Sequence, residues 1–187
     1  MNRDLIVFDF ETGGRNPHTC QATQLAALAI DGRNFKLKGT FNSEIWAETD
    51  DGKAEKKGLG VIEDGALKVT GKTREQISKA PKPKAVWSKF CNFVNKYNWK
   101  GTPFFAPVPA GYNIIGYDMI LVNRFCKEYG PWDESRQCQK LFSQVYKVDM
   151  MDNYWMWTEG DPSIKTRSMD SIRERMGMSS QNAHDAL

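Results

Sequence analysis

The sequence has 187 residues, 40% of them hydrophobic and 26% charged, as is typical of one soluble globular domain with a substantial core. It has no apolar stretch of membrane-spanning length, no resemblance to a signal peptide in residues 1–20 and no C-x-x-C pair among its four cysteines. We therefore expect reduced thiols and a cytoplasmic protein. The formal net charge of +3 permits a nucleic-acid partner without requiring one.

Residues 5–14 (LIVFDFETGG) begin as an apolar run that predicts a buried strand, and they end at paired glycines. Asp9 and Glu11 are two residues apart, so alternation along a strand should point both carboxylates to the same side. Adjacent like charges are costly to bury unless a cation neutralises them, and Mg2+ or Mn2+ prefers such oxygen ligands. Two solvated carboxylates at a strand end are the alternative for so short a motif.

Two further strands are expected after the glycines, at residues 21–30 (QATQLAALAI) and near 35–45, separated by an Asp31-Gly32 turn. Hairpin pairing of these strands with the first is the simple arrangement. Residues 47–65 are rich in charge and glycine, which predicts an exposed loop.

The second half of the chain shows mainly helical patterns. A small helix is expected within residues 66–80, with Thr73 as N-cap and Gln76 three residues later. Further helices are expected at 85–97, from about 115–118 to Gly130-Pro131, and within 147–157 after a short strand or turn. The last expected helix is at 164–178, with Ile172 and Met176 on one side. Residues 103–110 (PFFAPVPA) contain three prolines and predict at best an interrupted or edge strand. Strands followed by helices with one more strand between them indicate an α/β fold with one mixed β-sheet flanked by helices.

Two later positions extend the opening motif. Asp118 lies near a helix start, five residues after Asn113, and His184 lies close to the last residue given. Paired divalent ions held by carboxylates can clamp the attacking and leaving oxygens of a phosphodiester displacement, and a histidine can take the proton of the attacking water. The alternatives are an ordinary helix-initiating aspartate and a surface histidine. Asp149 receives no role beyond a structural one at a strand end.

Three motifs resemble the DnaQ-like 3′→5′ exonucleases of the ribonuclease H-like fold, in the DEDDh group with four acidic residues and a histidine. They are residues 8–14 (FDFETGG), 111–118 (GYNIIGYD) and 182–187 (NAHDAL), and their order and spacing are more specific than any single motif. The second and third motifs are most similar to the exonuclease I type, which degrades single-stranded DNA. Proofreading subunits and the ribonuclease T or oligoribonuclease types are close relatives.

The resemblance implies specific roles. Asp9, Glu11 and Asp118 would hold two Mg2+ or Mn2+ ions, and His184 would be the general base. Thr12 and Gly13 would lie against the terminal nucleotide, Phe10 or Tyr117 would pack on a base, and Asn113 is a further candidate on the substrate side.

The chain departs from the family pattern at its last motif. The family places its final metal-binding aspartate five residues after the histidine, which would be position 189, whereas the sequence given stops at Leu187. We therefore expect residues 1–187 to be a single exonuclease domain cut short just before that ligand.

The expected activity is metal-dependent 3′→5′ hydrolysis of single-stranded nucleic acid to 5′-mononucleotides, with DNA favoured and no membrane involved. The alternatives are an exoribonuclease that processes RNA 3′ ends, a catalytically impaired module that binds nucleic-acid ends, and a phosphohydrolase of small nucleotides. A replication or repair partner is left open.

Overall fold

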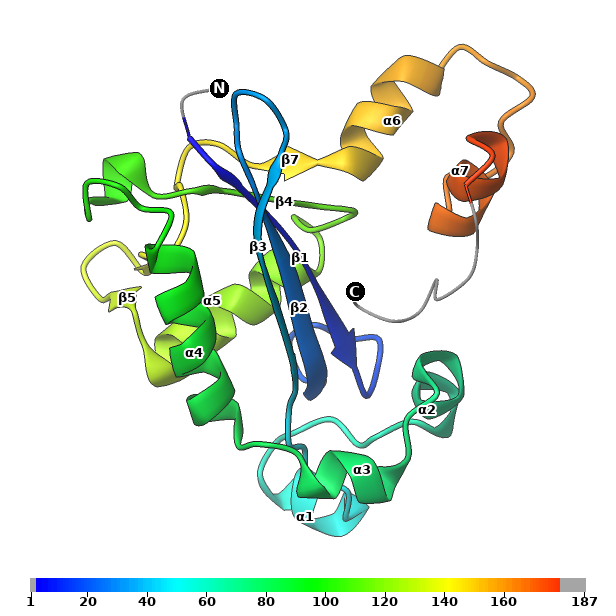
Figure 1. Ribbon diagram of the computed structural model, residues 1–187. Helices are drawn as coiled ribbons and strands as arrows, with labels where there is room; N and C mark the ends of the chain where they lie inside the picture. The colour runs from blue at the N-terminus through cyan, green and yellow to red at the C-terminus, as the bar shows by residue number, and fades with distance from the viewer. Residues whose placement is uncertain (1–2, 179–187) are drawn as a thin grey trace.

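A mixed sheet of five strands in the order β3-β2-β1-β4-β7 forms the centre of the molecule (Figure 1). The structure is a computed structural model that describes residues 3–178. The strands are β1 (Leu5–Thr12), β2 (Ala22–Ile30), β3 (Leu37–Glu44), β4 (Val108–Gly111) and β7 (Val148–Asp149), and a separate small ribbon pairs β5 (Trp132–Asp133) with β6 (Cys138–Gln139). β2 runs antiparallel to both β1 and β3, as expected, whereas β4 runs parallel to β1 and β7 runs parallel to β4.

Helices cover both sides of this sheet (Figure 1). They are α1 (Asp51–Lys56), α2 (Asp64–Thr70), α3 (Arg74–Lys79), α4 (Pro83–Asn95), α5 (Asp118–Tyr129), α6 (Met150–Thr158) and α7 (Met169–Arg175), with a 3₁₀ turn at Pro103–Phe105. The predicted capping box of Thr73 and Gln76 begins α3. None of the helices within residues 3–178 combines the length and apolar character that a membrane crossing requires.

The main core lies between the sheet and the helices α4 and α5. Ile6, Phe8 and Phe10 point from β1 into it, where the Phe8 ring stacks on that of Phe142 at a centroid distance of 5.3 Å. Because side chains alternate along a strand, Asp9 and Glu11 point to the opposite face. The prediction that the two carboxylates share one face is confirmed.

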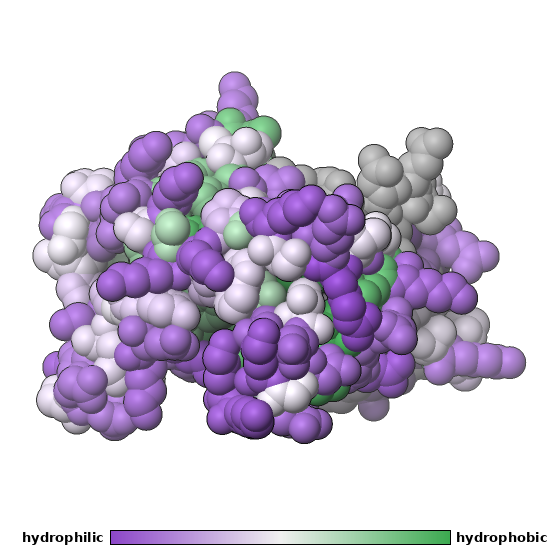
Figure 2. All heavy atoms as spheres, turned by 90° about the horizontal axis from the view of Figure 1, so that it is seen from below, coloured by the Kyte–Doolittle hydropathy of each residue, from purple (hydrophilic) through white to green (hydrophobic). Residues whose placement is uncertain are grey.

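Residues 47–65 are more ordered than the predicted exposed loop, and that prediction is wrong. The segment contains α1 and buries Ala47, Ala54 and Ile62. These apolar residues are too widely spaced among charged ones to show a periodic pattern. Only the outward side chains are polar, and the face that carries α1 and α3 is largely hydrophilic (Figure 2).

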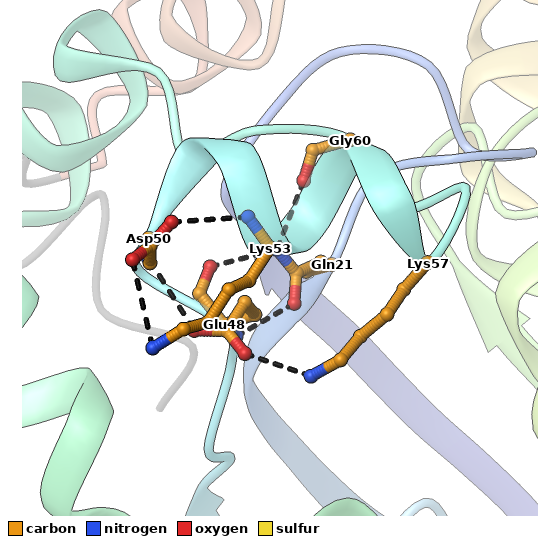
Figure 3. A network of polar contacts seen from close by, with 6 residues as sticks. All are labelled: Gln21, Glu48, Asp50, Lys53, Lys57 and Gly60. Carbon is orange, nitrogen blue, oxygen red and sulfur yellow. Dashed lines mark hydrogen bonds and ion pairs between the residues drawn. The ribbon is translucent and has the colours of Figure 1, made fainter.

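The Gln21 side chain holds this segment against the start of β2 (Figure 3). Its Nε2 donates to the carbonyl oxygens of Glu48 and Gly60 at 3.0 and 2.9 Å, and its Oε1 accepts from the Glu48 backbone N–H at 2.8 Å. The buried Gln21 amide therefore connects both ends of the segment 47–65 to the start of β2.

Replacing Gln21 with Leu should lower the free energy of unfolding by about 2–3 kcal/mol, because it leaves backbone groups unpaired. Urea denaturation would measure the loss. Lys57→Met is the matched control in the same network, since it removes the ion pair of the half-exposed Lys57 with Glu48 and a distant contact with the Trp46 ring but no backbone partner, and it should have a much smaller effect. Equal losses in the two variants would contradict this account of Gln21.

Two other predicted elements differ from the structure. Residues 103–110 were predicted to form an interrupted or edge strand; the segment is interrupted, with a 3₁₀ turn before β4, but β4 lies between β1 and β7, so the edge alternative is wrong. The Val108 N–H donates to the backbone carbonyl of Asp4, just before β1, so the backbone of the next residue, Pro109, faces β7 instead. Pairing with β7 begins only at Ala110. Pro109 therefore costs no ladder hydrogen bond.

The helix predicted at 164–178 begins only at Met169, after the Ser168 side chain has capped its first turn. Ile172 is buried, whereas Met176 is exposed and follows the last helical residue, so only Ile172 of these two side chains packs against the protein.

Candidate active site

A cleft of about 800 Å³ lies on the sheet face that carries the two strand carboxylates. Its walls come from the end of β1, the loop after β4, the first turn of α5, helix α2 and the segment leading into α7. Seven of the predicted site residues border it, namely Asp9, Phe10, Glu11, Thr12, Asn113, Tyr117 and Asp118. Strand and loop segments more than 100 residues apart thus meet at one place.

Asp118 and Asp9 are the electrostatic centre of the cleft. Asp118 is only 3% exposed, and one of its carboxylate oxygens accepts the Phe10 N–H at 3.0 Å. Burial and the neighbouring charge of Asp9 raise the pKa of Asp118 to about 8. Asp9 opens into the cleft, but the enclosing walls reduce its hydration, and this burial raises its pKa too.

This donor set fits a hard divalent cation. Carboxylates that resist ionising side by side become stable as anions when a cation lies between them. Asp9 and Asp118 could hold such an ion, with Glu11 on the same strand face. Within residues 3–178, no three His, Cys, Asp or Glu side chains form a preassembled metal cluster.

Tyr117 fixes the loop that follows β1. Its hydroxyl donates to the Gly14 carbonyl at 2.7 Å and lies 2.7 Å from Thr12 Oγ1, which also bonds to Gly14. Burial raises the pKa of the Tyr117 phenol, so it stays protonated and remains a donor. The hydroxyl of the ring expected to pack on a base is therefore engaged in holding Thr12 at the cleft.

Phe10 and Gly13 differ from what the resemblance implied. The Phe10 ring is in the core, 5.7 Å from the Phe125 ring between centroids, so it does not reach a base in the cleft. Gly13 does not border the cleft; its N–H donates to Gln21 and its carbonyl accepts from Glu63, both at 2.8 Å. A Cβ at Gly13 would collide with the Ile62 side chain. Both residues support the cleft from beneath.

Asn113 and Asp149 shape the loop after β4. Asn113 has a φ of 55°, a left-handed conformation that asparagine tolerates better than most residues. The buried Asp149 carboxylate accepts the N–H groups of Asn113, Ile115 and Met151 at 2.8, 3.1 and 3.0 Å. The sequence indicated only a structural role for Asp149 at a strand end, and its hydrogen bonds to the loop after β4 were not predicted.

Other residues at the cleft were also missed. Arg15 follows the first motif directly and is exposed on the wall. The Tyr112 hydroxyl donates to the Arg167 carbonyl, which ties the segment before α7 to the loop after β4. Arg15 could have been predicted as a site residue, because it is a cation directly beside the carboxylate motif. No local sequence pattern indicates that Arg167 borders the cleft. His184, the predicted general base, lies outside the described residues.

Comparison with known proteins places this geometry among nucleases. A family model described as RNase_T exonuclease matches residues 6–187. No curated protein gives a match to the chain.

Among solved structures, a structure of exonuclease I matches with a TM-score of 0.74 and 18% identity, over 98% of this chain and 38% of that one. E. coli exonuclease I in complex with a dT13 oligonucleotide matches with a TM-score of 0.73 and 17% identity, over 98% of this chain and 38% of that one. A zinc-bound complex of E. coli exonuclease I with single-stranded DNA matches with a TM-score of 0.68 and 18% identity, over 98% of this chain and 37% of that one. The fold is thus the ribonuclease H-like exonuclease fold, as predicted, and the chain spans about two fifths of the length of these proteins.

Proposed function

Because this chain belongs to the RNase_T exonuclease family, we propose that it hydrolyses single-stranded nucleic acid from the 3′ end and releases 5′-mononucleotides. The observation that carries the proposal is that Asp9 and the buried Asp118 border the same cleft of about 800 Å³, where burial and the Asp9 charge raise the pKa of Asp118 to about 8. Such a shift is typical of a functional carboxylate, since it reflects burial and then a neighbouring like charge, with no cation to compensate them.

In this proposal Asp9, Glu11 and Asp118 hold two Mg2+ or Mn2+ ions, which would stabilise the attacking and leaving oxygens of an in-line displacement. Phe10 orients Asp118 through its backbone N–H. Tyr117 holds the Thr12 hydroxyl at the cleft, where it can contact the terminal nucleotide, and Asn113 borders the same space. His184 would take the proton of the attacking water.

We further propose DNA as the preferred polymer. The second and third motifs are closest to the exonuclease I type, and E. coli exonuclease I has been solved with a deoxyribonucleotide oligomer and with single-stranded DNA. Processing of RNA 3′ ends is the alternative within the family.

The test is digestion of 3′-labelled and 5′-labelled single-stranded DNA and RNA of matched sequence with Mg2+, Mn2+ or EDTA. We expect a ladder of 5′-labelled products that shortens from the 3′ end, forms faster on DNA and disappears in EDTA. Shortening from the 5′ end, or cleavage that persists in EDTA, would contradict the proposal. Retention of the oligonucleotide without cleavage would identify an end-binding module instead.

A further inference from the structure

A second, smaller pocket of about 360 Å³ adjoins the cleft. Thr70, at the end of α2, borders both spaces, so the pocket continues the cleft sideways across the sheet. Its other walls are formed by β2, β3 and the turn after α2, through Gln24, Asn42, Ser43, Glu44 and Lys72. The three motifs that carry the family resemblance, at residues 8–14, 111–118 and 182–187, include none of these five side chains, although Lys72 lies in a weaker landmark of that resemblance, residues 69–73 (VTGKT).

Strand register connects this pocket directly to the cleft carboxylates. Glu11 of β1 pairs with Gln24 of β2, and Gln24 pairs with Glu44 of β3. Directly paired residues place their side chains on the same face of a sheet, about 5 Å apart. Gln24 is therefore the immediate lateral neighbour of Glu11, on the way from the cleft to the sheet edge.

Lys72 brings a positive charge to this position. Its ammonium donates to Gln24 Oε1, and Gln24 Nε2 donates to Asn42 Oδ1 at 2.9 Å. Gln24 is 4% exposed, so the amide that holds the ammonium is itself fixed. Among residues 3–178 no carboxylate forms an ion pair with Lys72, in contrast to Lys57 and Lys79. A neutral partner orients the Lys72 ammonium without cancelling its charge.

We propose that Lys72 binds the phosphodiester immediately upstream of the one that is cut, where the single strand leaves the cleft past Thr70. This inference rests on the proposed function. The carboxylates of the cleft repel phosphate unless cations are bound, whereas the adjoining pocket offers a fixed ammonium one strand away. A phosphate is the group that such a charge attracts, and the contact is independent of base sequence.

The test is fluorescence anisotropy of the protein with dye-labelled single-stranded oligonucleotides in EDTA, which prevents cleavage, between 50 and 200 mM salt. Lys72→Met should weaken binding about 3–10-fold for every base sequence and reduce the slope of log K against log salt by about 0.7, the value for one phosphate of a single strand. Lys72→Arg should restore both. Lys68→Met, on the exposed part of α2 outside both spaces, should change neither.

A purely structural role for Lys72 would shift the melting temperature but leave the salt slope of the folded variant unchanged, and that result would overturn the proposal. Glu44→Gln supplies a second variant that keeps Lys72 in place. It removes a negative charge from the pocket rim and should tighten binding about twofold, and unchanged or weaker binding would count against a phosphate here. If the wild-type protein cuts oligonucleotides but Lys72→Met has the wild-type salt slope, the phosphate site at Lys72 is contradicted and the proposed function is not. If the wild-type protein neither binds nor cuts oligonucleotides, the proposed function is contradicted as well.

Discussion

Replacing Asp118 with Asn should abolish cleavage and, at the same time, raise the stability of the metal-free protein. The loss of activity, at least about 10³-fold, follows because the site loses a carboxylate that neutralises a cation at the reacting phosphate. The gain in stability follows because burial and the Asp9 charge make ionised Asp118 unfavourable in the folded state. Asparagine keeps an oxygen that can accept the Phe10 N–H.

The pH dependence of this gain follows from the pKa values. The ordinary pKa of the carboxyl is 3.8, and in the folded protein it is raised to about 8. Below 3.8 both states are protonated and the wild type bears no penalty. As pH rises from 3.8 to about 8, only the unfolded state releases the proton freely, so wild-type stability falls. The advantage of Asp118→Asn should therefore grow over this range and level off above pH 8, at roughly 2–4 kcal/mol.

Urea denaturation in EDTA at pH 5, 7 and 9, beside digestion assays with Mg2+, would measure both effects. Asp133→Asn is a control of opposite sign, because hydrogen bonds from Ser135 and Arg136 lower the pKa of Asp133 and stabilise its ionised form. That variant should lose stability at neutral pH and keep full activity. An Asp118→Asn protein that still cleaves, or that is less stable than wild type at pH 9, would show that the carboxylate is structural.

Asp149→Ala should have the reverse effect on stability, lowering the free energy of unfolding by about 3–5 kcal/mol. Asp149 is also a buried carboxylate, but it accepts three backbone N–H groups, whereas Asp118 accepts one from outside its own helix. Its removal leaves those donors without an acceptor, uncaps α6 and releases the loop that carries Asn113. Nuclease activity should fall together with stability, because the loop that forms one wall of the cleft would be displaced.

Thermal and urea unfolding at pH 7 would measure the loss. Asp149→Asn retains one acceptor oxygen and should lie between the wild type and Asp149→Ala. The comparison with Asp118→Asn is the sharpest check, since two buried carboxylates on neighbouring elements should give stability changes of opposite sign. A stability gain in Asp149→Ala would contradict the structural role.

The amino-acid sequence by itself determined the local features of this protein. Alternation along residues 5–12 put Asp9 and Glu11 on one face and the phenylalanines on the other, because a strand has a period of two. The capping box of α3 was also local, since the free backbone groups of a helix terminus are satisfied by nearby side chains, and α5 begins at Asp118, within the predicted range 115–118. The motif order was enough to indicate the family.

The tertiary structure alone decided which of these residues are neighbours. The central position of β4 depends on pairing with β1 and β7, and no local pattern encodes strand order. The same long-range packing put the Phe10 ring in the core, Gly13 against Ile62 and Asp149 under the loop after β4. It also brought Lys72 to Gln24, 48 residues away, beside Glu11. Chemistry at a cleft depends on such contacts, because charge and hydrogen bonding act over a few ångströms of space, whatever the separation along the chain.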